Sequence, residues 1–270
     1  MGQAVRREAP YTGKKAVPTK GITPELSVAE AFAAQFSADG AIPLLPLLRA
    51  MQFGDSMLPV GGFSFSAGLE SAVQCGIVRT ADELHGFTRT ALAQAAAGDA
   101  VALACAVRAS AQGCDLEELS AMDTAVLTRK PGEENRAMSL RMGKKLLELA
   151  ARAADLPQAQ IWLAHVCGGY SPGTWPVAQG VVCAALGLTP QAACAVHQYG
   201  LAATILNASL RLMRVTHLDT QRILFACAGD IPEQCCRAAQ TSWRHMAAFA
   251  PMIDILAAHH VHAHVRLFMN

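Results

Sequence analysis

The sequence has few aromatic residues. They make up 6% of the 270 positions, while Ala and Leu are abundant in a chain that is 52% hydrophobic. Ala and Leu are strong helix formers, whereas sheet proteins carry more β-branched and aromatic residues. The composition therefore favours an all-α fold.

Charged residues are also scarce, at 16% of the chain, against about 25% in typical soluble domains. Lys plus Arg (22) nearly balances Asp plus Glu (21). Such a balance produces no global field that would draw the chain to nucleic acid or to an anionic membrane. We expect neither as a partner, and so few charges indicate a surface that takes part in protein interfaces.

The nine cysteines lack the pattern of a disulfide framework, because their number is odd and no C-x-x-C occurs. Most are interpreted as small buried apolar residues in a reducing compartment, in preference to metal or redox roles. The basic N-terminal residues are not followed by an apolar leader segment, and we expect no uncharged spanning helix. We predict a cytoplasmic protein.

Two catalytic motifs are missing. A nucleophile elbow requires G-x-S-x-G, but Ser66 stands where the second Gly belongs after Gly62 and Ser64. A phosphate loop requires G-x-x-x-x-G-K-[ST], and the Gly-Lys pairs at Gly13 and Gly143 have no Gly five positions earlier. We expect no enzyme and no nucleotide bound through a Walker motif.

Helical periodicity organises most of the chain. Residues 1–41 are predicted to be a flexible extension, in which a short helix could start at Thr23. Residues 42–270 are predicted to form one all-helical domain, a single-domain bundle of roughly ten helices. After a first helix and a Gly/Pro loop at 54–70, helices are expected through Leu69, after the Thr80/Glu83 capping box, and over about 98–112, 116–127, 134–153, 190–213, 218–227, 232–247 and 250–261. Residues 177–186 form an apolar segment after a turn-rich stretch.

Residues 58–70 read LPVGGFSFSAGLE. This run resembles the signature of the UreF family of urease accessory proteins, approximately L-P-x-G-[AG]-F-[ST]-x-S-x-G-L-E. The resemblance continues with Glu134 and Arg136 at the start of the helix predicted over 134–153, Arg211 in the longest predicted helix, and the ending R-L-F at 266–268. It covers most of the chain after the predicted extension.

The chain departs from the family pattern at three places. Trp175 stands where His is common, Thr216 and His217 lie where many members have P-L-G-Q, and His259 is followed by His260 instead of Glu. Any role that the family assigns to the turn at Thr216 is therefore not carried over.

The resemblance implies a dimeric chaperone subunit for nickel insertion. UreF-like proteins bind a second accessory protein, UreD (also called UreH), and recruit and regulate the GTPase UreG at apo-urease. No tightly bound cofactor is implied, and nickel would be in transit. Partner contacts are expected at residues that match the family pattern, namely Pro59, Gly61, Phe63, Ser64, Ser66, Gly68, Glu70, Glu134, Arg136, Arg211, His259, Arg266 and Phe268.

Four of the nine histidines lie within residues 259–264. Imidazole is a suitable ligand for Ni²⁺. His260 and His264 would share one face of a helix, and His260, His262 and His264 would share one face of a strand. These three are candidate metal ligands. The alternatives are contact with a partner, or exposure at a helix end, where a protonated His interacts favourably with the helix dipole.

A basic segment from Arg129 to Lys145 carries six Lys or Arg residues. Helical spacing places Arg141 near Lys144 and Lys145, which makes a positive face that could steer association with an acidic partner surface. A solvated helix face explains the same pattern equally well.

Two rival functions remain open. One is a hydrolase that uses Ser64 or Ser66 with a histidine such as His85, although nothing marks an acid or an oxyanion site. The other is a stand-alone Cys/His metal-binding storage or transport protein.

Overall fold

The computed structural model describes residues 44–55, 57–113, 115–247, 250–260 and 266–268. They belong to the compact unit Pro43–Asn270, which separates from Met1–Ile42. The predicted extension at 1–41 and its short helix lie outside the described residues.

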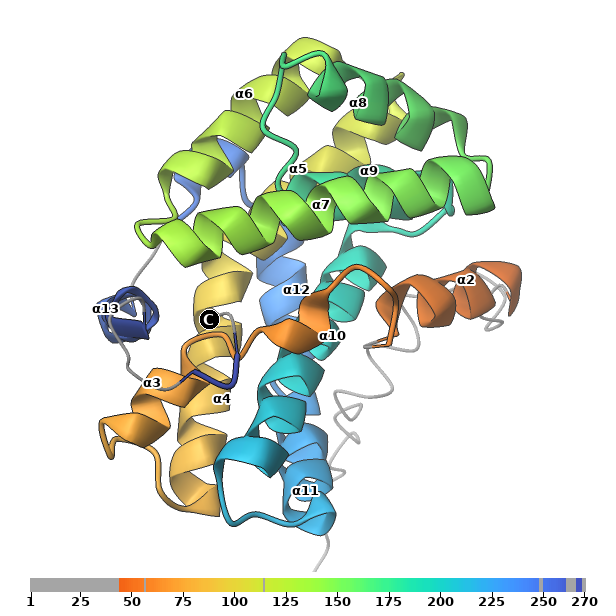
Figure 1. Cartoon of the computed structure of the whole chain (residues 1–270). Coiled ribbons are helices and arrows are strands. Elements are labelled where there is room, and N and C mark those ends of the chain that lie inside the picture. Colours follow the sequence, from red (N-terminus) through yellow and green to blue (C-terminus); the bar gives the residue numbers. More distant parts are fainter. Residues whose placement is uncertain (1–43, 56, 114, 248–249, 261–265, 269–270) are drawn as a thin grey trace, which may run out of the picture. The chain divides into compact units, whose positions relative to one another are not determined.

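Every regular element in the described part of the chain is helical, which confirms the all-α prediction (Figure 1). Labels beginning with η mark 3₁₀ helices. The elements are α2 (Leu44–Gly54), η1 (Gly62–Ser64), α3 (Leu69–Gln74), α4 (Ala81–Ala97), α5 (Asp99–Ala111), α6 (Leu116–Thr128), α7 (Glu133–Ala153), α8 (Pro157–Cys167), α9 (Trp175–Ala185), α10 (Pro190–Leu212), α11 (His217–Ala228), α12 (Ile231–Gln240), η2 (Trp243–His245) and α13 (Pro251–His260).

Side-chain caps begin several of these helices where the sequence predicted them. The Thr80 hydroxyl accepts from the Glu83 amide, and the Glu83 carboxylate accepts from the Thr80 amide. Asp115 caps α6, and Thr189 precedes Pro190 at the start of α10, the longest helix described. Each cap satisfies amides that have no partner within the helix.

The turn that departs from the family pattern also forms a capping box. The Asp219 amide donates to the Thr216 hydroxyl at 3.2 Å, and the Thr216 amide donates to the Asp219 carboxylate at 2.9 Å. The altered turn is therefore a regular helix start for α11.

The Ala-rich helix α5 lies in the main core and packs against α9 and α10. Ala102, Ala104 and Ala106 are completely buried. Gly180 of α9 lies so near α5 that a Cβ there would come within 2.6 Å of the Ala106 Cβ. Small side chains allow this close approach, and a larger one would overpack the contact.

Helix α7 runs alongside α9 and is held there by backbone contacts (Figure 1). A Cβ at Gly143 would lie 2.2 Å from the Gly173 carbonyl oxygen. The Trp175 amide donates to the Ser139 hydroxyl at 3.1 Å. These contacts set which face of α7 points inward.

A buried carboxylate organises the loop before α9. Asp123 of α6 accepts hydrogen bonds from the Ser171 hydroxyl at 2.7 Å and from the Gly173 and Thr174 amides at 2.6 and 2.8 Å. It also accepts from the Thr174 hydroxyl. A buried charge needs such complete hydrogen bonding, so Asp123 holds the loop that in turn contacts α7.

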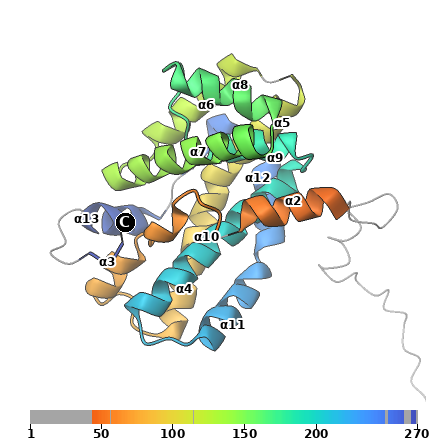
Figure 2. The same ribbon diagram turned by 45° about the vertical axis from the view of Figure 1, so that its right-hand side comes forward.

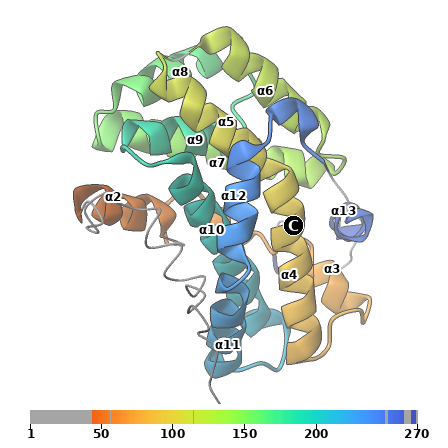
Figure 3. The same cartoon turned by 180° about the vertical axis from the view of Figure 1, so that it is seen from behind.

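A second cluster of buried apolar residues joins α3, α4, α10 and α11. It includes Leu69, Leu84, Ile205 and Ile223, together with Phe268 from the C-terminal segment. Figure 3 shows α10, α12 and α4 side by side. Helix α2 packs against α10 (Figure 2), while several of its leucines are exposed.

Two helix predictions were wrong. Helix α8 was not predicted, although Pro157 provides a good first helical position and Trp162 is completely buried. The helix predicted over 232–247 ends at Gln240, because Thr241 is extended and a new 3₁₀ turn begins after Ser242.

One helical stretch, Ala81–Ala111, is long and apolar enough to cross a membrane by length and composition alone. The share of its most apolar window that is buried inside the structure is 61%, which also fits a core helix. The sequence prediction concerned uncharged windows only, and this stretch contains Asp99.

Candidate partner-binding site

The signature residues 58–70 form most of the loop that joins α2 to α3 and the first two residues of α3. Gly61 and Gly68 have φ values of 86° and 83°, a conformation that favours glycine. The Ser64 hydroxyl donates to the Gly61 carbonyl at 2.8 Å. Phe65 is buried, whereas Phe63 is 72% exposed. The loop is thus held by its own contacts and presents one aromatic ring to solvent.

The last signature residue, Glu70, lies in the first turn of α3 and is 1% exposed. Its amide donates to the buried Ser66 hydroxyl at 3.2 Å. Its carboxylate accepts from the Leu267 amide at 2.8 Å and from the Phe268 amide at 3.0 Å. The Glu70 side chain therefore binds the C-terminal segment through the backbone amides of that segment.

His260 connects Glu70 to Glu134. Its Nε2 lies 2.9 Å from Glu70 Oε2, and its Nδ1 lies 2.9 Å from Glu134 Oε2. Arg266 Nη1 donates to the other Glu134 oxygen at 2.7 Å. The His260 ring therefore bridges the carboxyl groups of α3 and α7.

Phe268 completes the cluster. Its ring is buried, and the Arg211 guanidinium lies 4.5 Å from the ring centroid, a cation–π arrangement. We name the cluster of Glu70, Glu134, His260, Arg266 and Phe268 the tail clasp. It draws on α3, α7, α13 and the C-terminal segment, and Arg211 covers it from α10.

Comparison with known proteins identifies the family of this chain. The sequence model of the UreF family matches residues 78–228. The urease accessory proteins UreF of Yersinia enterocolitica and of Yersinia pseudotuberculosis are each 48% identical to this chain over 224 residues, 83% of this chain and 98% of each relative. The chain belongs to the UreF family. The resemblance inferred from residues 58–70 is confirmed.

The structure of this UreF-family chain divides the predicted contact residues into two groups. The tail clasp brings together Glu70, Glu134, Arg266 and Phe268, which the sequence separates widely. The buried members cannot touch a partner while the tail is docked. The members that are exposed or partly exposed are Pro59, Gly61, Phe63, Ser64, Glu134, Arg136, Arg211, His259 and Arg266, and the buried ones are Ser66, Gly68, Glu70 and Phe268.

Arg136 lies outside the tail clasp. Its Nη1 donates to the carbonyl oxygens of Lys130 and Pro131 at 2.7 and 2.8 Å. It therefore closes the turn between α6 and α7. Contact of any of these residues with a partner stays a prediction.

The candidate metal ligands are only partly described. His262 and His264 lie outside the described residues, and both ring nitrogens of His260 contact carboxylates. Sequence reasoning missed this pairing, although the Glu residues were both marked by the family pattern. Within the described ranges, no group of three or more His, Cys, Asp or Glu residues is placed to hold a metal ion.

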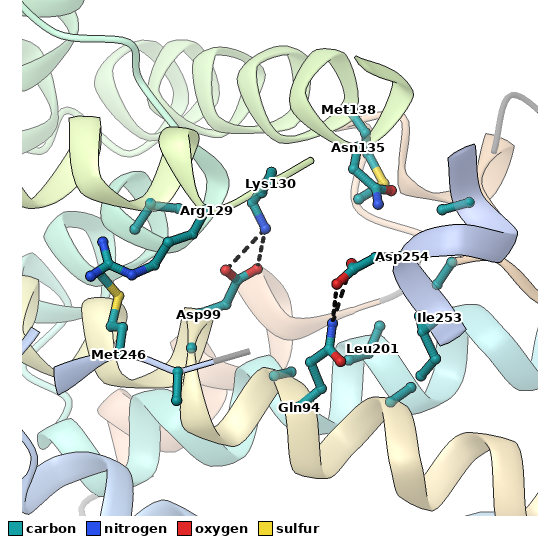
Figure 4. A pocket seen from close by; sticks show the side chains of 17 residues that line it. Gln94, Asp99, Arg129, Lys130, Asn135, Met138, Leu201, Met246, Ile253 and Asp254 are labelled. Carbon is teal, nitrogen blue, oxygen red and sulfur yellow. Dashed lines mark hydrogen bonds and ion pairs between the residues drawn. The ribbon is translucent and has the colours of Figure 1, made fainter. Parts of the chain in front are cut away.

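A cavity of about 150 Å³, lined mostly by apolar side chains with a few charged and amide groups, lies beside α13 (Figure 4). Lys130 Nζ donates to both carboxylate oxygens of Asp99 at 2.9 and 2.7 Å. Across the cavity, Gln94 donates to Asp254 at 3.3 Å. Among the described residues that line it there is no Ser, Cys or His, so the cavity offers polar contacts but no hydroxyl, thiol or imidazole group.

The electrostatics of this cavity differ between its two carboxylates. Burial raises the pKa of Asp99, but the charge and hydrogen bond of Lys130, together with the charge of His197, hold that pKa below its usual value. Burial raises the pKa of Asp254, and the Gln94 hydrogen bond only partly opposes this. Asp99 is therefore a paired anion, while Asp254 is the carboxyl group in the cavity that takes up a proton more readily.

Proposed function

We propose that this UreF-family chain is a non-catalytic subunit of the machinery that assembles the nickel centre of urease. In this role it binds a UreD/UreH-like accessory protein, recruits a UreG-like GTPase to apo-urease and regulates it. It acts in the cytoplasm as a homodimer, with nickel in transit through the complex. The observation that carries the proposal is 48% identity to proteins named urease accessory protein UreF.

The tail clasp supports a role in assembly. Family-pattern residues at both ends of the described domain are used to dock the C-terminal segment on α3 and α7. A docked segment presents one defined surface to a partner. Binding then requires less ordering of the segment, which reduces the entropy cost of association. Exposed Arg211 and Arg266 lie at this place and supply polar contacts.

The serines proposed for the rival hydrolase have structural partners. The Ser64 hydroxyl donates to the Gly61 carbonyl, and the buried Ser66 hydroxyl accepts from the Glu70 amide. Each bond lies within the signature loop or the helix that follows it. A nucleophile is activated by a base within hydrogen-bond reach, whereas the Ser64 hydroxyl donates to a backbone carbonyl, which favours a scaffold.

The rival metal-storage function is weakened by the cysteines of the core. Burial raises the pKa of the Cys183 thiol to about 12 and that of the Cys235 thiol to about 12. Burial also raises the pKa of the Cys194 thiol. The thiolate is the form that binds metal, so these thiols are poor ligands near neutral pH.

Deletion and complementation test the proposal. A urease-positive strain that lacks this chain should make urease protein with little activity, and expression of the chain should restore activity. Purified chain should also co-elute with the UreD-like and UreG-like proteins of the same strain. Full urease activity without the chain would refute the proposal.

Two variants sharpen the experiment. Glu70→Ala should reduce urease activation because it releases the tail, whereas Glu117→Ala on an exposed part of α6 should not. A fluorophosphonate probe provides the check on the hydrolase alternative, since labelling of the purified chain would support that rival. Light scattering of the purified chain reports whether it is a dimer.

A further inference from the structure

A groove of about 640 Å³ lies between the signature loop and α7. One wall is formed by loop residues from Pro59 to Phe65, and the other by the middle of α7. Its volume is within the range of about 300–1,000 Å³ that ligand pockets occupy. The fold thus joins the family signature to the basic segment, two features that the sequence presents separately.

The loop wall is apolar and contains the exposed ring of Phe63. The loop makes backbone hydrogen bonds within itself: the Ser64 and Phe65 amides donate to the Gly61 and Gly62 carbonyls. A large aromatic side chain that is 72% exposed on an internally bonded loop is a suitable anchor for a binding partner.

The helix wall is positively charged. Arg141, Lys144 and Lys145 are exposed there, and Glu148 is the one acidic residue among the described residues that line the groove. Three cations and one anion give a net charge of +2. Because Lys145 pairs with Glu148 at 2.9 Å, the charges of Arg141 and Lys144 remain without an ion pair in the described part of the chain.

The positive charge of the helix wall affects the pKa of Glu148. The hydrogen bond from Lys145 lowers the pKa of this carboxyl group, and Lys144 and Arg152 lower it further by their charge. A carboxylate placed in the groove would experience the same cations.

The loop wall and the helix wall are held in fixed positions relative to each other. Gly143 and Ser139 fasten the opposite face of α7 to the loop before α9, so the basic face must point outward. A Cβ at Gly62 would lie 3.4 Å from the Met142 methyl group, which places η1 directly against α7. Because the walls are already fixed, they lose little conformational entropy when a ligand fills the groove.

We propose that this groove binds an acidic segment of a partner protein. One apolar side chain of the segment packs on Phe63, and flanking carboxylates pair with Arg141 and Lys144. The inference rests on the proposed function in one respect: the partner is sought among the proteins that co-purify during urease maturation.

Charge and symmetry favour a protein segment over other occupants. A nucleic acid would need a longer basic stripe, and the whole chain has a formal net charge of only +1. A two-fold contact between copies through this groove would bring Arg141 and Lys144 toward the same cations of the second copy, which like-charge repulsion disfavours.

Photo-crosslinking tests the inference in the strain used for complementation. Phe63→p-benzoylphenylalanine places a crosslinker in the groove, and mass spectrometry identifies the attached segment after irradiation. We expect a segment of another protein with carboxylates beside the attachment point. The combined substitution R141E and K144E should reduce the yield about tenfold or more, as for loss of close charge pairs.

The matched control is the combined substitution R222E and R237E, which reverses two exposed charges on α11 and α12. It should leave the yield unchanged. Changing the carboxylates of the identified segment to lysine should restore crosslinking to the charge-reversed groove. Circular dichroism of each purified variant confirms that it folds.

The inference is overturned if the crosslinker attaches to a second copy, to nucleic acid, to lipid, to a segment without carboxylates, or to nothing. It is also overturned if charge reversal leaves the yield unchanged. These results differ from failure of the proposed function, which would appear as full urease activity in the strain without the chain.

Discussion

His260 Nε2 lies 2.9 Å from Glu70 Oε2, although 190 positions separate the two residues. Both side chains are buried, with exposures of 0% and 1%. The contact joins the end of α13 to the helix that follows the signature loop. Docking of the C-terminal segment therefore depends on a residue near the start of the domain, and changes at Glu70 should be detected at the tail.

Glu70→Ala should release the tail. The change leaves the Leu267 and Phe268 amides and the His260 ring without their acceptor, and we expect the free energy of tail opening to fall by roughly 3 kcal/mol. Hydrogen exchange at the two amides measures this free energy. Glu70→Gln keeps one acceptor oxygen and should cost less. Wild-type exchange rates in Glu70→Ala would show that the clasp does not hold the tail.

His260→Ala should leave the Ni²⁺ affinity of the chain unchanged. Both ring nitrogens already contact carboxylates, so metal binding through His260 would have to break the tail clasp. Calorimetry on this variant, beside one with His262 and His264 changed to Ala, separates the three candidate ligands. A tenfold weaker affinity in His260→Ala, with Ni²⁺ accelerating exchange at the Leu267 amide, would contradict the prediction.

Asp123→Asn should destabilise the domain by roughly 3 kcal/mol, because an amide cannot accept all the hydrogen bonds that the buried carboxylate accepts. Urea unfolding monitored by circular dichroism measures the loss. Asp82→Asn, on the exposed surface of α4, is the matched control and should change stability by less than about 0.5 kcal/mol. Equal stability of the two variants would mean that the loop before α9 does not need Asp123.

His197 should make the domain less stable in mild acid. Burial lowers the pKa of His197, and Lys130 adds to this while Asp99 opposes it. Below the unfolded pKa of about 6.5, the unfolded chain binds a proton that the folded chain resists. Stability is then lost at up to about 1.4 kcal/mol per pH unit until the folded pKa is reached.

Comparison with His197→Gln isolates this effect, because the other titrating groups are common to both proteins. The stability of the wild type relative to the variant should decrease between pH 7 and pH 5, as measured by urea unfolding. A relative stability that does not change with pH would exclude the assignment.

The cysteines should separate into two reactivity classes. Cys75 and Cys167 are exposed, whereas burial raises the pKa of the Cys183 and Cys235 thiols to about 12. With iodoacetamide at pH 8, mass spectrometry should find the exposed pair alkylated and the buried pair alkylated only after unfolding. Rapid alkylation of the buried pair, slowed by added metal, would revive the storage function.

Local chemistry accounts for the parts of the fold that could be predicted. Thr80 with Glu83 and Thr189 with Pro190 are complete start signals within four residues, so the helices begin where the sequence indicates. The break at Thr241 is different. It lies where the Arg108 guanidinium from α5 hydrogen-bonds the carbonyl oxygen of Ala239, a contact that periodicity in α12 cannot reveal.

The sequence alone determined the helical class, most helix starts and, through residues 58–70, membership in the UreF family. These properties depend on neighbours in the chain, whose spacing is already defined by the backbone. Only the tertiary structure decided that Glu70, Glu134 and His260 form one buried cluster, and that Phe63 faces Arg141 and Lys144 across a groove. Those pairings join segments that lie far apart in the sequence and meet only when the helices pack. A charged or buried side chain has no defined partner until the chain has folded.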